Sequence, residues 1–180
     1  MTPRLAALLF AIGVNAAVAQ TMVNFNNVVL NPPPDRLVRF TGGAPVVGTN
    51  FMAVLLYGTS ESSLIAALPP ARFRVPTTAL PGTWQGGDRT LTGIEIPGTQ
   101  VTMRVDVFDI QQFPDYAAAA AGGGILGSSA LFTYLVPAPG GQFIDINNFQ
   151  GFSIIPEPTV IGLCGLGAFI VWAVKRRRRD

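Results

Sequence analysis

The sequence predicts an all-β fold: an antiparallel β-sandwich of immunoglobulin-like or jelly-roll type, with a signal helix before it and a transmembrane helix after it. Three observations predict this arrangement. Short apolar runs are separated by turn-forming residues, since the 180 residues include 20 glycines and 15 prolines. One of these runs alternates apolar and polar residues with the period of a strand. Long uncharged apolar segments lie near both ends of the chain.

The clearest strand signal is the segment QVTMRVDVFD, from Gln100 to Asp109. Its apolar side chains share one face of a strand, because residues two apart point the same way; they are Val101, Met103, Val105 and Val107. A second segment, FMAVLLY from Phe51 to Tyr57, is apolar throughout and ends at Gly58. Its composition predicts a central strand that is buried on both faces.

Further strands are expected at the other short apolar runs, at 22–30, 37–40, 72–75, 89–96, 130–136 and 149–155. About eight strands separated by turn signals are typical of a sandwich. The run SESSLIAAL at 60–68 fits either a short helix or a strand. Asp115 to Ala121 predicts one or two helical turns that close one end of the sandwich, because Asp115 can cap them and glycines 122–124 can end them.

The N-terminal residues have the pattern of a signal peptide at 1–19. Arg4 supplies a positive charge, and Leu5 to Val14 forms an apolar stretch of ten residues, too short for a comfortable membrane span. Small residues at Ala17 and Ala19 then precede the expected cleavage before Gln20. The secreted domain is therefore expected at 20–155, which is a normal size for one domain with its own core.

The C-terminal residues 156–180 have three parts in a fixed order. Pro156, Glu157 and Pro158 come first, and residues 159–174 (TVIGLCGLGAFIVWAV) carry no charge. A basic run closes the segment, at Lys175, Arg176, Arg177, Arg178 and Arg179. A helix over 159–174 would be about 24 Å long at ~1.5 Å per residue, and snorkelling arginines help so short a span to cross a bilayer. The basic run would stay on the cytoplasmic side.

This tail resembles the PEP-CTERM sorting signal of Gram-negative bacteria. The resemblance implies export, transient membrane tethering and recognition by an exosortase, and an association with envelope, extracellular polysaccharide or biofilm matrix. A plain single-span anchor is the alternative. Weaker similarity to uncharacterised ectodomains of the same group lies at 24–27, 55–58, 84–91, 129–132 and 149–152. This second resemblance implies a single secreted domain and no activity.

Charge and cysteine content narrow the classes of partner. The predicted domain has six arginines against eight acidic residues, a net charge of −2, whereas the whole chain is +2. The positive excess lies in the tail, so no nucleic-acid partner is expected. The single cysteine, Cys164, falls in the apolar span, and we expect it to be a small helix residue rather than an acylation site. The secreted domain therefore has no disulfide.

The residues needed for most enzyme chemistry are missing. The chain has no histidine, which excludes Ser-His-Asp and Cys-His catalysis and ordinary zinc, copper or haem sites. We expect no cofactor, no metal and no enzymatic activity. Acidic residues leave two weaker alternatives, a carboxylate-based hydrolase or a calcium site built from Asp106, Asp109 and Asp115.

Trp84 is the best candidate for contact with a ligand. It lies in the loop sequence PGTWQGG, where an exposed indole could stack on a sugar ring. The alternative, which we favour, is that Trp84 packs into the core, as large aromatic side chains usually do.

The sequence therefore predicts a non-enzymatic envelope or matrix protein. It would be exported across the inner membrane, anchored transiently with its C-terminus in the cytoplasm, and then released to the envelope or the exterior. Its expected partners are the export machinery, an exosortase and the membrane, with polysaccharide as a further possibility. The alternative function is a carbohydrate-binding module or a polysaccharide hydrolase.

Overall fold

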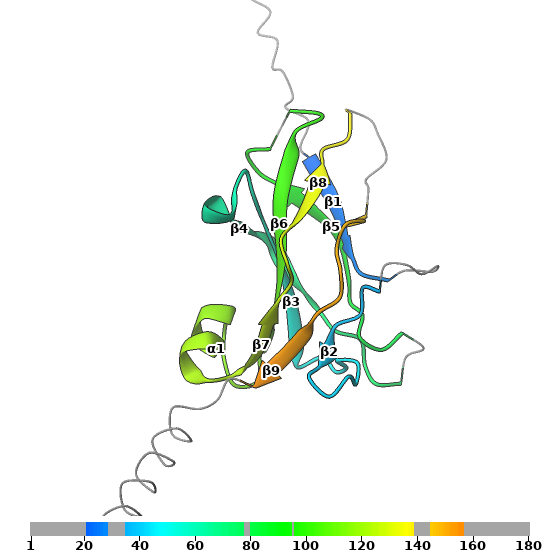
Figure 1. Cartoon of the computed structure of the whole chain (residues 1–180), viewed down its shortest axis with the longest axis vertical. Coiled ribbons are helices and arrows are strands. Elements are labelled where there is room, and N and C mark those ends of the chain that lie inside the picture. The colour runs from blue at the N-terminus through cyan, green and yellow to red at the C-terminus, as the bar shows by residue number, and fades with distance from the viewer. Residues whose placement is uncertain (1–20, 29–34, 78–79, 95, 139–144, 157–180) are drawn as a thin grey trace, which may run out of the picture.

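The computed structural model describes residues 21–28, 35–77, 80–94, 96–138 and 145–156, and these residues form an all-β fold. The strands are β1 (Thr21–Asn26), β2 (Arg39–Phe40), β3 (Phe51–Gly58), β4 (Ile65–Arg72), β5 (Gln85–Leu91), β6 (Gln100–Asp109), β7 (Ile125–Ser128), β8 (Phe132–Leu135) and β9 (Ser153–Pro156). The helices are α1 (Tyr116–Gly122) and the 3₁₀ turn η1 (Glu61–Ser63). Figure 1 shows the strands, with α1 beside β7 and β9.

The strands form one large sheet and one small sheet. The large sheet has the order β2-β9-β7-β6-β3-β4, with β8 also paired to β6, and the small sheet is the antiparallel pair β1-β5. The β2-β9 pair is parallel, whereas the other pairs of the large sheet are antiparallel. One edge of β6 pairs with β3 along its whole length. The opposite edge pairs with β8 near Gln100 and with β7 near Asp109. The long strand β6 is therefore the centre of the fold, and its predicted limits are confirmed.

The central strands β3 and β6 both bury their inner face, but the outer face of β3 is only partly covered. In β6 the predicted alternation is confirmed, because its four odd-numbered apolar side chains are fully buried. In β3 the odd-numbered residues are buried as well, but the even-numbered Met52, Val54 and Leu56 are half-buried. The expectation that β3 is buried on both faces is therefore wrong. Its outer face is covered incompletely, by α1 and its neighbours.

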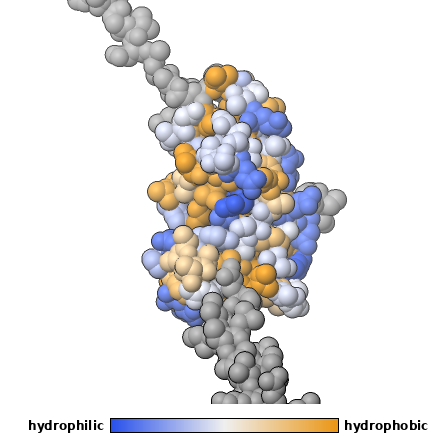
Figure 2. All heavy atoms as spheres, turned by 60° about the vertical axis from the view of Figure 1, so that its left-hand side comes forward, coloured by the Kyte–Doolittle hydropathy of each residue, from blue (hydrophilic) through white to orange (hydrophobic). Residues whose placement is uncertain are grey.

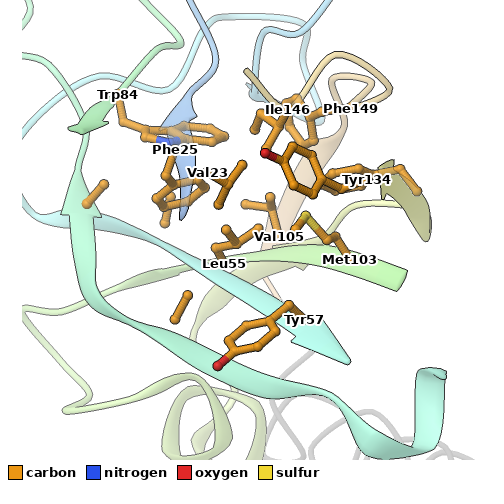
Figure 3. Packing of buried hydrophobic residues seen from close by; sticks show 14 of the residues in the cluster. Val23, Phe25, Leu55, Tyr57, Trp84, Met103, Val105, Tyr134, Ile146 and Phe149 are labelled. Atoms are coloured by element: carbon orange, nitrogen blue, oxygen red, sulfur yellow. The ribbon is translucent and has the colours of Figure 1, made fainter. Parts of the chain in front are cut away.

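The main hydrophobic core takes residues from both sheets. Val23 and Phe25 of the small sheet pack in one cluster with Leu55 and Val105 of the large sheet (Figure 3). Arg89 of β5 adds a polar tie between the sheets, since its Nε donates to the Pro69 carbonyl of β4 at 2.5 Å. Burial lowers the pKa of Arg89, and its guanidinium lies 5.7 Å from the centre of the Phe25 ring.

Two strands lie elsewhere than predicted: the strand expected at 89–96 is β5 at Gln85–Leu91, and the one expected at 72–75 is replaced by β4 at Ile65–Arg72. The segment at 60–68 contains both alternatives, because serines 60 and 63 close a 3₁₀ turn before β4 begins at Ile65. Strand β4 ends where the run 72–75 was expected to begin a strand. Strand β4 contains two prolines, Pro69 and Pro70, which cannot donate to a neighbouring strand. They are tolerated because they lie where the β3–β4 register shifts, between the pairs Ala53–Ala71 and Leu55–Ala67, on the last strand of the large sheet.

The predicted helix is confirmed as α1, and its ends are those that the sequence suggests. Asp115 accepts a hydrogen bond from the Ala118 N–H at 2.8 Å, and Gly123 ends the helix with a left-handed backbone (φ 73°). The helix packs on Phe108 and Leu126 through Ala119. It covers the outer face of the large sheet near the end of β9, rather than closing the gap between the two sheets (Figure 1).

Candidate functional site

The predicted sorting motif begins inside the last strand of the domain. Pro156 is the final residue of β9 and pairs with Ile125 of β7. The rest of the predicted processing signals lies outside the described residues: Glu157, Pro158, the span 159–174, the basic residues 175–179, and Ala17, Ala19 and Gln20 near the signal cleavage. Within the part of the chain that the structure describes, no helix is long and apolar enough to cross a membrane.

Trp84 lies in the main core and not on the surface. It is fully buried, and its ring centre lies 5.2 Å from that of Phe25, 5.4 Å from Phe73 and 5.6 Å from Phe149. Its backbone N–H donates to Oδ1 of the buried Asn27 at 2.8 Å. An indole surrounded in this way presents no face to a sugar ring, so the favoured alternative, a core residue, is confirmed (Figure 3).

The three aspartates that suggested a calcium site each have a different local partner. Asp109 accepts from the Gln111 N–H at 2.8 Å, Asp115 caps α1, and Asp106 pairs with Arg104. Among the described residues no three His, Cys, Asp or Glu side chains come close enough to hold a metal ion. The calcium alternative is therefore wrong for these three aspartates, and their spacing in sequence reflects strand and helix ends.

Asp106 is instead the buried centre of a polar network on the outer face of the large sheet, whose other members are half-buried or exposed. Its carboxylate accepts from Arg104 Nε at 2.8 Å and Nη2 at 3.0 Å, and from Ser128 Oγ at 2.7 Å. The Tyr116 hydroxyl lies 2.8 Å from Ser128 Oγ, which connects α1 to the network. The hydrogen bonds to Asp106 raise the pKa of Arg104. Because Asp106 is 3% exposed and already accepts three bonds, the network is suited to fixing α1 rather than to binding a substrate.

A shallow polar pocket lies where β2 runs beside β9. Its volume is about 310 Å³, and its lining residues are Asp35, Leu37, Arg39, Gln150, Gly151, Phe152 and Ser153. The two backbones cross closely here, since a Cβ on Gly151 would lie 2.2 Å from the Leu37 carbonyl oxygen. Glycine is therefore needed at position 151 to form the base of the pocket.

The pocket presents a cation and an anion side by side. Arg39 Nη2 donates to Asp35 Oδ2 at 2.7 Å, and this bond, followed by one from the Leu37 N–H, lowers the pKa of Asp35 from its ordinary value of 3.8. Both side chains are accessible to solvent, and the half-buried Phe152 lies in the same lining. Carboxylate, guanidinium, amide and hydroxyl groups near an aromatic ring can bind the hydroxyls of a carbohydrate.

Sequence reasoning missed this pocket because its two halves are far apart in the chain. Residues 35–39 meet residues 150–153 through the parallel β2-β9 pairing, and such a pairing between two short strands leaves no local signal. The Asp35-x-x-x-Arg39 spacing was visible, but nothing placed it beside Gln150 and Ser153. No known protein family, curated protein or solved structure matches this chain.

Proposed function

We propose that this chain is a non-enzymatic envelope or extracellular-matrix protein that is processed by an exosortase and works with exopolysaccharide or biofilm. The three-part tail at 156–180, with the motif Pro156-Glu157-Pro158 before the apolar and basic segments, carries the proposal. The fold supports it, because β9 ends at Pro156 and the motif therefore follows the domain without a linker.

The same proposal includes where the domain is located and how the membrane holds it. The signal peptide at 1–19 takes the domain across the inner membrane, and the segment 159–174 holds it there with the basic run in the cytoplasm. The sandwich architecture of the secreted domain, 20–155, is part of the proposal. It is supported by the core that β1 and β5 share with the large sheet.

Mass spectrometry of both termini tests this proposal on protein purified from each fraction of the native host. The expected mature chain starts at Gln20 and ends between Pro156 and Thr159. A strain without exosortase should keep the complete tail, as should a Glu157→Ala variant, whereas Glu61→Ala serves as a matched control on the surface of the domain. Retention of Asp180 in the membrane fraction of the normal host would show that the chain is a permanently anchored protein instead.

The polar pocket favours a second function, binding of polysaccharide. In this proposal the sugar does not contact Trp84, which is buried. It contacts the ion pair Asp35–Arg39 together with Gln150 and Phe152. A hydrolase has less support, because Asp35 is the one acidic residue of the pocket lining and glycosidases use two carboxyl groups.

Calorimetric titration with the host's purified exopolysaccharide tests whether the pocket binds polysaccharide. If the pocket binds sugar, Arg39→Ala should weaken binding strongly and Arg72→Ala, a change at an exposed arginine of β4, should leave it unchanged. Equal affinity of both variants and the unmodified protein would rule out this pocket as the binding site.

A further inference from the structure

The polypeptide leaves the domain at a fixed point. Strand β9 is held in the large sheet to its last residue, with Leu126 opposite Ile155 and Ile125 opposite Pro156. Ile154 is fully buried in the main core. A Cβ on Gly127 of β7 would lie 2.9 Å from the Ser153 carbonyl oxygen, so β7 and β9 approach closely. Backbone pairing and burial therefore hold the chain in the sheet up to Pro156.

Very little chain separates this point from the predicted membrane span. Glu157 and Pro158 stand between the end of β9 and Thr159. Two residues reach about 7 Å when fully extended, at ~3.3–3.6 Å per residue. A folded domain that is joined to a span by so short a connection must lie against the surface of the bilayer.

The end of the domain near this exit includes α1, the turn that precedes it and the loop before β3 (Figure 1). Residues 110–124 (IQQFPDYAAAAAGGG) carry a single charge, at Asp115. Ala117 and Ala121 are exposed on one side of α1, while Phe113 and Tyr116 are half-buried beside it. Figure 2 shows α1 as a weakly apolar area at the lower end of the molecule. Aromatic and small uncharged residues are tolerated at the headgroup level of a membrane.

We infer that, while the chain is anchored, this end of the domain faces the bilayer and the domain stands upright on it. The inference rests on the proposed function, since it needs the tail to span the membrane. In this orientation, the Asp109 end of β6 lies near the membrane and the Gln100 end, at the other end of this ten-residue strand, lies far from it. The turn η1 follows Gly58, which pairs with Thr102, whereas α1 packs on Phe108. At ~3.4 Å per residue, η1 therefore lies about 20 Å higher than α1.

Fluorescent labels at the two ends of the domain test this orientation. The background is the full chain with Cys164→Ala, reconstituted in vesicles of phosphatidylethanolamine and phosphatidylglycerol. A label is attached at Ala121→Cys on α1 or, as the matched control, at Ser62→Cys on η1; both positions are exposed. Lipids that carry a quencher near the headgroup are then added. We expect loss of fluorescence at position 121 and none at position 62.

A second variant and a membrane-integration assay separate the possible failures. A long Gly-Ser insertion after Pro158 should restore fluorescence at position 121, because the domain can then move away from the bilayer. If the chain is integrated but the label at 121 is not quenched, the orientation is wrong and the proposed function stands. If the chain is extracted from the vesicles by carbonate, the tail does not span and both proposals fail.

Discussion

The two faces of the large sheet are stabilised in different ways. The inner face packs against β1 and β5 through a large aromatic core in which Trp84, Phe25 and Phe149 are fully buried. The outer face has a small cluster of Phe108, Ala119 and Leu126 under a seven-residue helix. Half-buried side chains such as Met52, Val54 and Phe113 extend this cluster, and the polar network of Asp106 lies beside it.

The difference indicates which part of the molecule determines the fold and which part can open locally. Loss of packing in the inner core affects both sheets at once, whereas α1 is joined to the sheet by the Tyr116–Ser128 hydrogen bond and by the smaller apolar cluster. Local opening is favoured where buried apolar contacts are few. The predictions below test this contrast.

The largest effect is expected at the inner core. Trp84→Ala removes a side chain that contacts three aromatic rings, and we expect a loss of about 3–5 kcal/mol in the free energy of unfolding. Trp84→Phe keeps part of the packing and should cost less. Urea unfolding followed by circular dichroism measures both. A loss below that of Trp84→Phe would contradict the central position of this residue.

A smaller effect is expected on the outer face. Asp106→Asn removes the charge that Arg104 pairs with, and we expect a loss of about 1–3 kcal/mol in unfolding free energy. The same change at Asp145, an exposed aspartate, should have almost no effect. Hydrogen exchange should show faster opening of α1 than of β6 in Asp106→Asn. Equal acceleration in both elements would mean that the network stabilises the whole sheet.

The cap of α1 should contribute less again. Asp115→Ala leaves the Ala118 N–H without its acceptor, which costs about 1 kcal/mol for a typical N-cap. Asp115→Ser should recover most of that loss, because serine also accepts this bond. Hydrogen exchange in α1 is the direct measurement. Unchanged exchange in Asp115→Ala would show that packing on Phe108 and Leu126 is sufficient to hold the helix.

The smallest effect is expected at the pocket ion pair. Asp35→Asn should change stability by less than about 1 kcal/mol at neutral pH, because exposed pairs contribute little. The lowered pKa of Asp35 means that the pair stabilises the fold above its ordinary pKa of 3.8 and that this contribution is lost as pH falls through the folded value. Melting temperatures of both proteins should therefore converge in acid. A constant difference at all pH values would contradict an electrostatic origin.

The sequence predicted those elements whose signals are local. Strand β6 has a period-two pattern and α1 has a cap and a glycine stop, so both were found at nearly their observed limits. Strand β7 was missed because Ile125–Ser128 is four residues long and contains Gly127, which the close approach of β9 requires. The pocket and the Asp106 network depend on residues that tertiary pairing brings together, and their spacing in the chain carries no such information.

The two prolines of β4 have a consequence for how this edge strand can pair with another chain. Unpaired strand edges attract other strands and lead to uncontrolled polymerisation. Pro69 and Pro70 supply no N–H on either side of β4, and Arg89 already donates to the Pro69 carbonyl. An incoming strand would therefore find fewer hydrogen-bond partners along this part of β4 than along a strand without proline. The arrangement disfavours edge-to-edge pairing of the domain with another copy at β4.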